Sequence, residues 1–589
     1  MAVVRWFWSI LKGALNTIAR AVVILVLIFV ALAVVGSASE RDLPENMVLT
    51  LDLREDLQDK TAPDFFEFEV TEMSLVDVVL GLDAASRDER VSGIFLRVGA
   101  GDISVPKSEE LREALRRFQD AGKFVIAHSQ GFYSSGLGGF GVAALADEIW
   151  MQPASAFFAA GAASTTLFFR GLFDNIDAEP QFVQRHEYKN SANIFTETAF
   201  TPAHREATER ILLSWYETAT NQIAADLGIA RDTLIGILDG SPLIVDEAVE
   251  NGLVTSIGYD DDARDAALER AGAGAELAEF STYVRENREA RARADGPVVA
   301  LVHAVGEIVE GTESGPLTSP MLIRGDDFAE AIRAATEDED VRAILLRVDS
   351  PGGSAVASDQ ILDALNKAQA AGKPLVASMG ALAASGGYYI SLGADRIVAN
   401  PGTITGSIGV LWGKVAAGGS LELIGVNSEE LGVGANALFL SGLEPWSAEQ
   451  LVEVNAQADA IYEDFTRKVA DGRNMSEEQV DEVARGRVWT GADALERGLV
   501  DDLGGFWTAV DYVKELAEID PETEVAFRQY PRRRGVFERL ESMFEVSSAG
   551  IRALQGLDRI LSLEPIQALL SAAYNAPRGR VELLAVGVP

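Results

Sequence analysis

Two stretches of the chain, residues 91–130 and 341–380, share one pattern of apolar and polar positions without a gap. Each begins with an apolar run ("GIFLRV" and "AILLRV") and passes through a glycine-bearing turn into an amphipathic segment of helical spacing. Each then ends with an AGK turn and a second apolar run, "KFVIAHS" or "PLVASM". Short apolar strands that alternate with helices predict βαβ units, in which helices cover parallel strands. The repeat therefore predicts an α/β protein made of two copies of one module.

A second matching pair marks the far end of each copy: "DEAVENGLVTSIG" (246–258) resembles "ADALERGLVDDLG" (492–504). We therefore expect an N-terminal module over residues 45–290 and a C-terminal module over residues 296–520, joined by the charged run "VRENREARARADG". Residues 521–589 are predicted to form a C-terminal helical tail, because "VFERLESMFEVSSAGIRALQGLDRILSL" is amphipathic at helical spacing.

The N-terminal segment, residues 1–44, has a different pattern. Its first 39 residues contain no acid, and three basic residues precede the apolar stretch from Ala21 to Ala38. That stretch has about the minimum length for a membrane helix, roughly 17 residues. Because the basic residues come first, we expect the N-terminus to be cytoplasmic and the stretch to be a transmembrane signal anchor. A signal peptide cleaved near "GSAS" is the alternative.

Composition narrows the possible functions. The formal net charge of −40 argues against a nucleic-acid partner, because phosphate binding needs a basic face, and it is interpreted as a solvated surface. The chain has no cysteine, which excludes disulfides, zinc–thiolate sites and thiol nucleophiles. It has four histidines (His128, His186, His204 and His303) and no HExxH motif, so we expect no metal site.

Ser385 is the first candidate for chemistry. In "GALAASGGYYIS" (380–391) it follows a predicted strand and opens a predicted helix, where free backbone N–H groups can hold a developing oxyanion. Gly386 and Gly387 leave space for a substrate carbonyl, and the "PGG" of "RVDSPGGS" (347–354) exposes more N–H groups at a neighbouring strand end. The first module has "RVGAGDIS" at the matching place, so the copies have diverged here. An N-cap serine is the structural alternative.

A serine nucleophile needs a base. Within the second module only His303 is available, and its place on a predicted strand favours a packed core histidine. Lys189 in "RHEYKNSANIF" is the other candidate, because burial can lower the pKa of an amine towards neutrality. The second module has "LGVGANALF" there, with Val433 opposite Lys189. Each module therefore lacks the partner that the other retains, which predicts one composite site within each chain.

These motifs resemble signal peptide peptidase A, the SppA family of Ser-Lys membrane peptidases, in its long two-module form. "RVDSPGGS", "MGALAASGGYYIS", "ANPGTITGSIGV" and "EYKNSAN" carry the resemblance, which covers nearly the whole chain. It implies that Ser385 is the nucleophile and Lys189 the general base, and that the amides of Gly352 and Gly386 form the oxyanion hole. It also implies that Ser407 hydrogen-bonds the lysine amine and orients it.

The resemblance further implies tandem modules of the Clp protease-like, crotonase-related α/β fold with parallel βαβ units, behind an N-terminal transmembrane helix. The expected activity is a membrane-anchored serine endopeptidase that degrades remnant signal peptides after processing, without metal, ATP or other cofactor. The expected assembly is a homotetramer at the bacterial inner membrane, single-pass, with the N-terminus cytoplasmic and the catalytic modules periplasmic. Its partners would be peptide substrates and the membrane, with no nucleic acid.

Three other interpretations remain open on the residues alone. The βαβ pattern and glycine-rich turns also suit a crotonase-type acyl-CoA enzyme, although a membrane anchor fits that class poorly. A catalytically inactive membrane scaffold of the same fold is the second alternative. A Ser-His-Asp protease is the third, and it requires His303 or a first-module histidine to reach Ser385.

Overall fold

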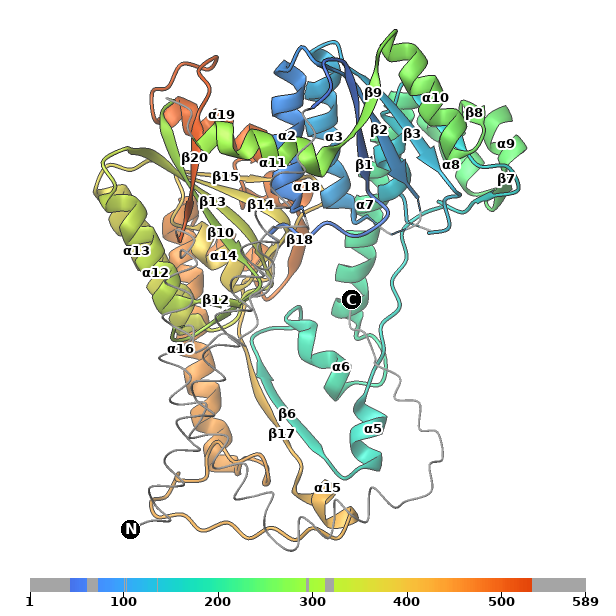
Figure 1. Ribbon diagram of the computed structural model, residues 1–589. Coiled ribbons are helices and arrows are strands. Elements are labelled where there is room, and N and C mark those ends of the chain that lie inside the picture. Colours follow the sequence, from blue (N-terminus) through green and yellow to red (C-terminus); the bar gives the residue numbers. More distant parts are fainter. Residues whose placement is uncertain are drawn as a thin grey trace, which may run out of the picture.

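The computed structural model describes residues 43–60, 73–99, 101, 103–134, 136–292, 296–312 and 322–531 (Figure 1). The predicted anchor and residues 532–589 of the predicted tail lie outside these ranges. Among the described helices, none combines the length and the hydropathy that a membrane crossing requires.

The first module is built on a six-stranded sheet in which every strand pairs in parallel. Its central strands coincide with the apolar runs of the sequence, and those runs are almost fully buried. In spatial order the strands are β8 (Ser256–Ile257), β4 (Glu148–Met151), β3 (Phe124–Ser129), β2 (Val91–Val98), β1 (Met47–Asp52) and β9 (Glu276–Glu279).

The second module repeats that order strand for strand. From the equivalent edge, its strands are β19 (Asp502–Leu503), β15 (Arg396–Ala399), β14 (Leu375–Ala384), β13 (Val341–Ser350), β10 (Val298–Val305) and β20 (Ala526–Tyr530). Two more strands extend it from the end of β14: β16 (Ile404–Gly406), and β18 (Val488–Thr490), which is antiparallel to β16. The prediction of an α/β protein with parallel sheets in two copies is confirmed.

Helices of equal length also recur in the two modules. α3 (Val105–Asp120) and α13 (Ala355–Ala370) both have 16 residues, and α7 (Pro202–Leu227) and α16 (Ala448–Arg473) both have 26. The other longer helices are α2 (Leu75–Arg87), α10 (Asp260–Ala271), α11 (Phe280–Ala292), α12 (Gly325–Glu337) and α19 (Phe506–Leu516). The short ones in the sheet-bearing part are α4 (Gly138–Ala144), α8 (Arg231–Leu238), α9 (Val245–Glu250), α14 (Gly386–Ser391), α17 (Glu477–Val483) and α18 (Gly491–Glu496). Small strand pairs complete it: β5 (Ala156–Phe157) with β7 (Leu243–Ile244), and β11 (Glu307–Val309) with β12 (Leu322–Arg324).

One boundary differs from the expectation. β20 lies beyond residue 520, where we expect the helical tail to begin, and it pairs in parallel with β10 as an edge strand of the second sheet. Its counterpart β9 pairs with β1 in the same way. The second module therefore extends at least to Tyr530.

The two modules share a hydrophobic core. Phe506, Val510 and Val513 of α19 belong to the same cluster of buried side chains as Leu111 and Phe118 of α3. Because α19 packs both on α3 and on β13 and β14, it joins the first module to the second sheet.

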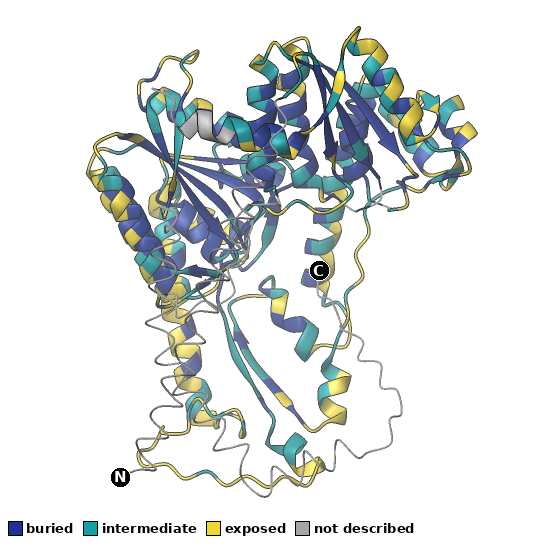
Figure 2. Ribbon diagram, in the orientation of Figure 1, coloured by how far each residue is buried: buried dark blue, intermediate teal, exposed yellow. Residues whose placement is uncertain are grey.

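An arm projects from the two sheets (Figure 1). Its centre is an antiparallel pair of strands from different modules, β6 (Glu179–Gln184) and β17 (Leu411–Ala416), with α5 (Arg170–Asn175), α6 (Asn193–Thr196) and α15 (Gly418–Leu423) beside them. The sheets are dark blue in Figure 2, whereas most of the arm is teal or yellow. The arm is therefore much less buried than the sheets.

Candidate active site

Ser385 lies at the turn between β14 and α14. Its backbone angles, φ 54° and ψ −116°, fall in a region that residues with a Cβ rarely adopt. The Ser385 amide donates to the carbonyl oxygen of Gly406 (2.8 Å), which holds the turn against β16. The next position is tightly packed, because a Cβ on Gly386 would lie 2.6 Å from Ser358 Oγ and would force a neighbour to shift. Strained serine turns of this kind cluster at functional sites.

Lys189 reaches this serine from the first module. Its ammonium group donates to Ser385 Oγ (3.0 Å), to Ser407 Oγ (2.9 Å) and to the Ser407 carbonyl oxygen (2.9 Å). Its side chain is only 6% exposed, and this burial lowers the pKa of the amine to about 8. Near that pH a large share of the amine is neutral, and a neutral amine can accept a proton from a serine hydroxyl.

The structure thus brings Ser385, Lys189 and Ser407 together within one chain, although Lys189 and Ser385 are 196 residues apart in sequence. β6 leads to Lys189, and β16 leads to Ser407, so two elements of different modules deliver the lysine and its partner. The arrangement places an amine with a lowered pKa on a serine hydroxyl at a strained turn.

Sequence reasoning missed the loop that supports Lys189. Gly486 has φ +81°, and a Cβ at this position would lie 2.4 Å from the backbone nitrogen of Lys189. On one side of this glycine, the Arg485 guanidinium pairs with the Glu187 carboxylate at 3.0 Å. On the other side, the Arg487 guanidinium lies 4.8 Å from the ring centre of Tyr188. No motif marks residues 485–487, since their role depends on contact with the other module.

The two predicted oxyanion-hole glycines also lie side by side. A Cβ on Gly352 (φ +96°) would lie 2.4 Å from the Gly386 nitrogen, so the glycine turn and the start of α14 touch through their backbones. The Gly352 amide donates to Ser350 Oγ (3.1 Å), a bond that the sequence does not reveal. The Ser350 hydroxyl in turn donates to the Gly306 carbonyl (2.7 Å), which fixes the turn to the end of β10.

His303 is not the hydrogen-bond partner of Ser385 in this structure. It lies on β10 opposite Arg347 of β13, and burial lowers the pKa of its imidazole to about 4. Its Nδ1 atom is buried and has no hydrogen-bond partner among the described residues. A histidine that stays neutral at neutral pH within the sheet matches the interpretation as a packed core residue.

The described residues include no cluster of three or more histidine, aspartate or glutamate side chains arranged to bind a metal ion. The Ser–Lys pair itself contains no metal-ligating group of the kinds found in structural or catalytic zinc sites.

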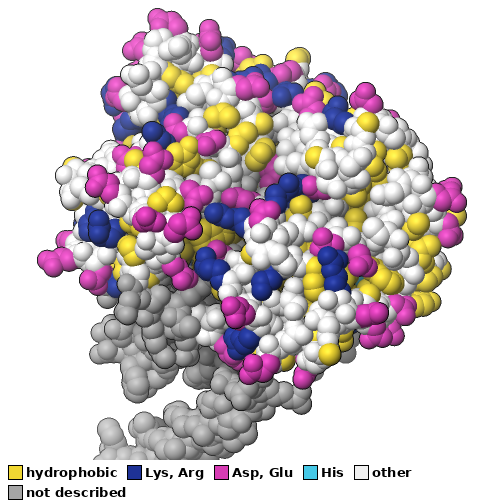
Figure 3. All heavy atoms as spheres, turned by 90° about the horizontal axis from the view of Figure 1, so that it is seen from above, with side chains coloured by type: hydrophobic (Ala, Val, Ile, Leu, Met, Phe, Trp, Pro, Cys, Tyr) yellow, Lys and Arg dark blue, Asp and Glu magenta, His cyan; other side chains and the backbone are white. Residues whose placement is uncertain are grey.

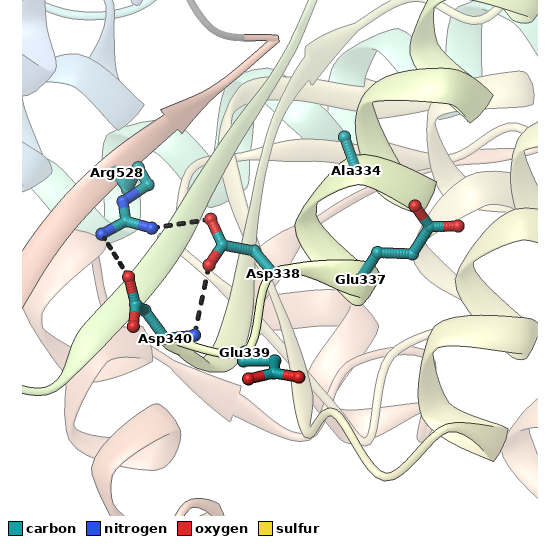
Figure 4. Close-up of a pocket in the computed structure, with 6 residues that line it drawn as sticks. All are labelled: Ala334, Glu337, Asp338, Glu339, Asp340 and Arg528. Atoms are coloured by element: carbon teal, nitrogen blue, oxygen red, sulfur yellow. Dashed lines mark hydrogen bonds and ion pairs between the residues drawn. The ribbon is translucent and has the colours of Figure 1, made fainter.

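A surface hollow lies at the turn between α12 and β13 (Figure 4). Arg528 donates there to Asp338 Oδ2 (2.6 Å) and Asp340 Oδ2 (3.1 Å). These acids precede β13, whereas Ser385 follows β14, and the two strands are parallel. The hollow therefore lies where the parallel strands begin, whereas Ser385 lies where they end.

The outer face of the two modules is mixed in charge. Figure 3 shows acidic side chains spread across this face with lysine and arginine side chains between them. This distribution fits the interpretation of the net charge as a solvated surface.

Comparison with known proteins gives a consistent result. The model of "Peptidase family S49" matches residues 117–274 and 367–520, one segment in each module. "Protease 4" of Salmonella typhi is 34% identical over 460 residues, which cover 76% of this chain and 73% of that protein. "Serine protease SPPA, chloroplastic" of Arabidopsis thaliana is 29% identical over 546 residues, covering 91% and 79%.

A solved structure, a mutant of ClpP1 from Listeria monocytogenes, is similar at 15% identity and a TM-score of 0.21, covering 36% of this chain and 94% of that one. At that score the Clp protease-like description of the modules stays a prediction. The family match rests on both modules and on relatives that span most of the chain. This chain belongs to peptidase family S49 and is a serine peptidase.

Proposed function

We propose that this serine peptidase is a membrane-anchored endopeptidase with a Ser385–Lys189 dyad that degrades remnant signal peptides. The observation that carries the dyad is the 3.0 Å contact between Lys189 Nζ and Ser385 Oγ, made by an amine whose pKa burial lowers to about 8. The names of relatives support the substrate class: one from Enterococcus faecium, 33% identical over 225 residues, is called "Putative signal peptide peptidase SppA".

The proposed reaction starts when neutral Lys189 takes the proton of Ser385 Oγ and the oxygen attacks the peptide carbonyl carbon. The negative charge moves to the carbonyl oxygen, where the backbone amides of Gly386 and Gly352 stabilise it. For Gly352 this requires its amide to turn from Ser350 Oγ towards the substrate. The Lys189 ammonium then protonates the departing amine, which leaves an ester on Ser385.

Hydrolysis of the ester reverses these proton transfers. Neutral Lys189 takes a proton from a water molecule, the hydroxide attacks the ester carbonyl, and the ammonium returns the proton to Ser385 as the acid product leaves. Ser407 keeps the amine directed at Ser385 throughout, because its hydroxyl and its carbonyl oxygen both accept hydrogen bonds from Lys189.

The test uses the full-length chain in detergent with a fluorogenic peptide ester. Ser385→Ala and Lys189→Ala should both abolish hydrolysis, and the wild-type rate should rise as pH passes through about 8. Lys414→Ala is the matched control, because Lys414 is a half-buried lysine that donates to the Ser441 carbonyl (2.8 Å) in the arm. A folded but inert wild type would favour the scaffold alternative, and activity that survives Lys189→Ala would exclude the dyad.

We propose the membrane anchor at residues 21–38 on the pattern of the sequence, with the N-terminus cytoplasmic and the modules periplasmic. Removal of residues 1–40 should move the peptidase from the membrane fraction to the soluble fraction without loss of ester hydrolysis. Retention of the shortened chain in the membrane would place the anchor elsewhere.

We also propose the homotetramer, and the repeat suggests how copies meet. β6 of the first module pairs with β17 of the second within one chain. At the offset of 248 residues that relates α5 to α15, the repeat equivalents are residues 427–432 of the second module and 163–168 of the first, and neither segment forms a strand. The match of Val433 to Lys189 requires a gap of four residues after this segment. Both expose apolar side chains, with Leu431 89% and Leu167 61% exposed. Pairing of these segments between copies would be a head-to-tail contact, and such a contact gives a closed ring when the rotation between copies closes after four copies.

Leu431→Asp should therefore yield monomers in size-exclusion chromatography with light scattering, whereas Val356→Asp, at an exposed position on α13, should not. A Leu431→Asp protein that keeps the mass of a tetramer would contradict this arrangement.

A further inference from the structure

Helix α3 of the first module places a carboxylate inside the second module. Glu110 is 2% exposed, which is unusual for a charged residue and requires strong partners. Its Oε2 atom accepts from Arg347 Nη1 (3.2 Å) and from Asn400 Nδ2 (2.8 Å), and its Oε1 atom accepts from the Phe506 amide (2.6 Å). One side chain therefore holds three separate segments of the other module.

The first segment is β13, which leads to the predicted oxyanion turn. Arg347 lies five residues before Gly352 and is fully buried. It donates to Asp59 Oδ1 of the first module (2.7 Å) and to Ser378 Oγ of β14 (2.9 Å), the strand that leads to Ser385. A buried guanidinium depends on its anionic partners, since removal of one leaves charge uncompensated in a low-dielectric interior.

The second segment is the turn that leads to Ser407. Asn400 begins this turn, because its carbonyl accepts from the Thr403 amide (3.0 Å), and β16 follows directly. The same strand receives the Ser385 amide at Gly406 (2.8 Å). It ends immediately before Ser407, the partner of Lys189. A shift of Asn400 would therefore be transmitted along β16 to Ser385, through the bond at Gly406, and to Lys189, through Ser407.

Two further first-module side chains hold the tip of this turn. Glu109, the neighbour of Glu110, accepts from the Gly402 amide at 2.7 Å. Trp215 of α7 donates its indole N–H to the Gly402 carbonyl, also at 2.7 Å. Both polar backbone groups of Gly402 are thus bound by the first module, which supports the same coupling independently of Glu110.

We propose that Glu110 is a positioning residue of the peptidase: its buried carboxylate makes the geometry of Ser385 and Ser407 depend on the docking of the first module. The proposal rests on the proposed Ser–Lys function. Docking alone is a weaker account, because Glu113, one turn further along α3, also bonds across the interface without touching β13 or the turn. Its partners are the Gly505 amide (2.7 Å) and Thr508 Oγ1 (3.1 Å) at the start of α19.

This difference supplies a matched pair of variants, Glu110→Gln and Glu113→Gln, in the full-length enzyme. The three groups around Glu110 all donate, so the amide NH₂ of a glutamine must face a donor and release one segment. We expect Glu110→Gln to lower kcat for the peptide ester by 10- to 100-fold with KM within about twofold, because the loss falls on the geometry of reaction. Glu113→Gln should keep kcat within about twofold.

The pH profile separates positioning from loss of folded protein. A loosened dyad admits water to Lys189, which moves the pKa of its amine up from about 8 towards the ordinary 10.5 and displaces the rise of kcat/KM to higher pH. Unfolding of a fraction of the enzyme lowers the rate at every pH equally. Trp215→Phe removes the indole N–H that binds the Gly402 carbonyl, together with part of the ring. It should displace the profile in the same direction even if Glu110→Gln folds poorly.

Equal behaviour of the Glu110 and Glu113 variants, or an unchanged pH profile in both Glu110→Gln and Trp215→Phe, would overturn the proposal. Ser385→Ala, measured alongside, distinguishes a failure of the proposed function from a failure of the positioning role. If Ser385→Ala retains activity, the proposed function fails. If it is inactive while Glu110→Gln equals wild type, only the positioning role fails.

Discussion

The two modules share one strand order but differ where the third strand passes into the following helix. In the second module Ser385 stands there with φ 54°, in front of α14. In the first module Leu137 stands there with φ −91°, in front of α4, and its side chain is 2% exposed. The helices start 248 residues apart, as do β4 and β15 behind them, so the two positions are equivalent.

The difference separates what the proposed reaction requires from what the fold requires. The first module builds the same sheet with an unstrained backbone and a buried leucine at the junction. Only the second keeps the strained serine. Conversely, the first module supplies the buried Lys189, whereas Val433 at the equivalent place in the second is fully exposed. The scaffold therefore does not need the strain or the buried amine, and both are unfavourable features that the proposed composite site explains.

The largest expected effect comes from removing the strained serine. Ser385→Gly should reduce ester hydrolysis by at least about 10⁴-fold, because the attacking oxygen is lost. The same change should stabilise the fold by about 1 kcal/mol, because glycine adopts a positive φ without strain. Leu137→Ala, at the equivalent position, should instead lower the free energy of unfolding by about 3 kcal/mol, because removal of a buried leucine side chain leaves a cavity.

Thermal and urea unfolding of both variants check this pair. A lower melting temperature for Ser385→Gly would show that the turn is not strained, and residual activity would show that Ser385 is not the nucleophile.

The next largest effect concerns the amine. Lys189→Arg keeps a cation at the site but cannot lose its proton, so kcat/KM should fall by about 10³-fold and show no rise towards alkaline pH. In the wild type the pKa of Lys189 is lowered to about 8 by burial, so the active neutral form increases as pH passes through that value. The Lys414→Arg variant in the arm should retain the wild-type profile.

Rates from pH 6 to 10 measure both profiles. A plateau already reached at pH 6 in the wild type would contradict a lysine base. A rise at pH 8 that persists in Lys189→Arg would assign the titration to another group.

A smaller effect is expected at the loop that supports the lysine. Gly486→Ala would place a Cβ 2.4 Å from the backbone nitrogen of Lys189, and the loop that carries Lys189 must shift to relieve this contact. We expect a 10- to 100-fold loss of kcat. Gly372→Ala is the matched control, since Gly372 has a similar φ of +84° and open space around it, so it introduces strain without the contact.

Both variants should lose a similar amount of stability, about 1 kcal/mol, from the positive φ. If Gly372→Ala reduces kcat as much as Gly486→Ala, the loss reflects general destabilisation and not displacement of Lys189.

The sequence was sufficient for the features that repeat or fail to repeat. The equal spacing of apolar runs predicts the two parallel sheets, and the complementary loss of Ser385 and Lys189 predicts that they meet. The repeat also contained the signal for β20: at the offset of 250 residues, "EVAFRQY" lies opposite "GAELAEF", the region of β9. The expected end of the second module at residue 520 lies before this segment, so the prediction left β20 out of the module.

Other features depend on contact between the modules, which has no local pattern. Glu110 belongs to the charged run "EELREALRRFQD", which is typical of a solvated helix face, yet it is buried against the second module. Gly486 is unremarkable in sequence until the Lys189 loop is placed beside it. The bond from the Gly352 amide to Ser350 likewise depends on the three-dimensional path of one turn.

The smallest effect is expected at Ser407, where the effect depends on a single hydrogen bond to Lys189. Ser407→Ala removes one acceptor of Lys189 but leaves the backbone carbonyl oxygen at 2.9 Å, so the amine stays near Ser385 with less directional control. The loss of one hydrogen bond is worth about 1 kcal/mol, which predicts a decrease in kcat of about fivefold to tenfold. Ser391→Ala, at a buried serine of α14 that bonds only the Gly387 carbonyl among the described residues, should leave kcat near that of wild type. If Ser407→Ala is as damaging as Lys189→Arg, Ser407 must relay the proton itself and the dyad becomes a triad. If it has no effect, the carbonyl oxygen alone orients the lysine.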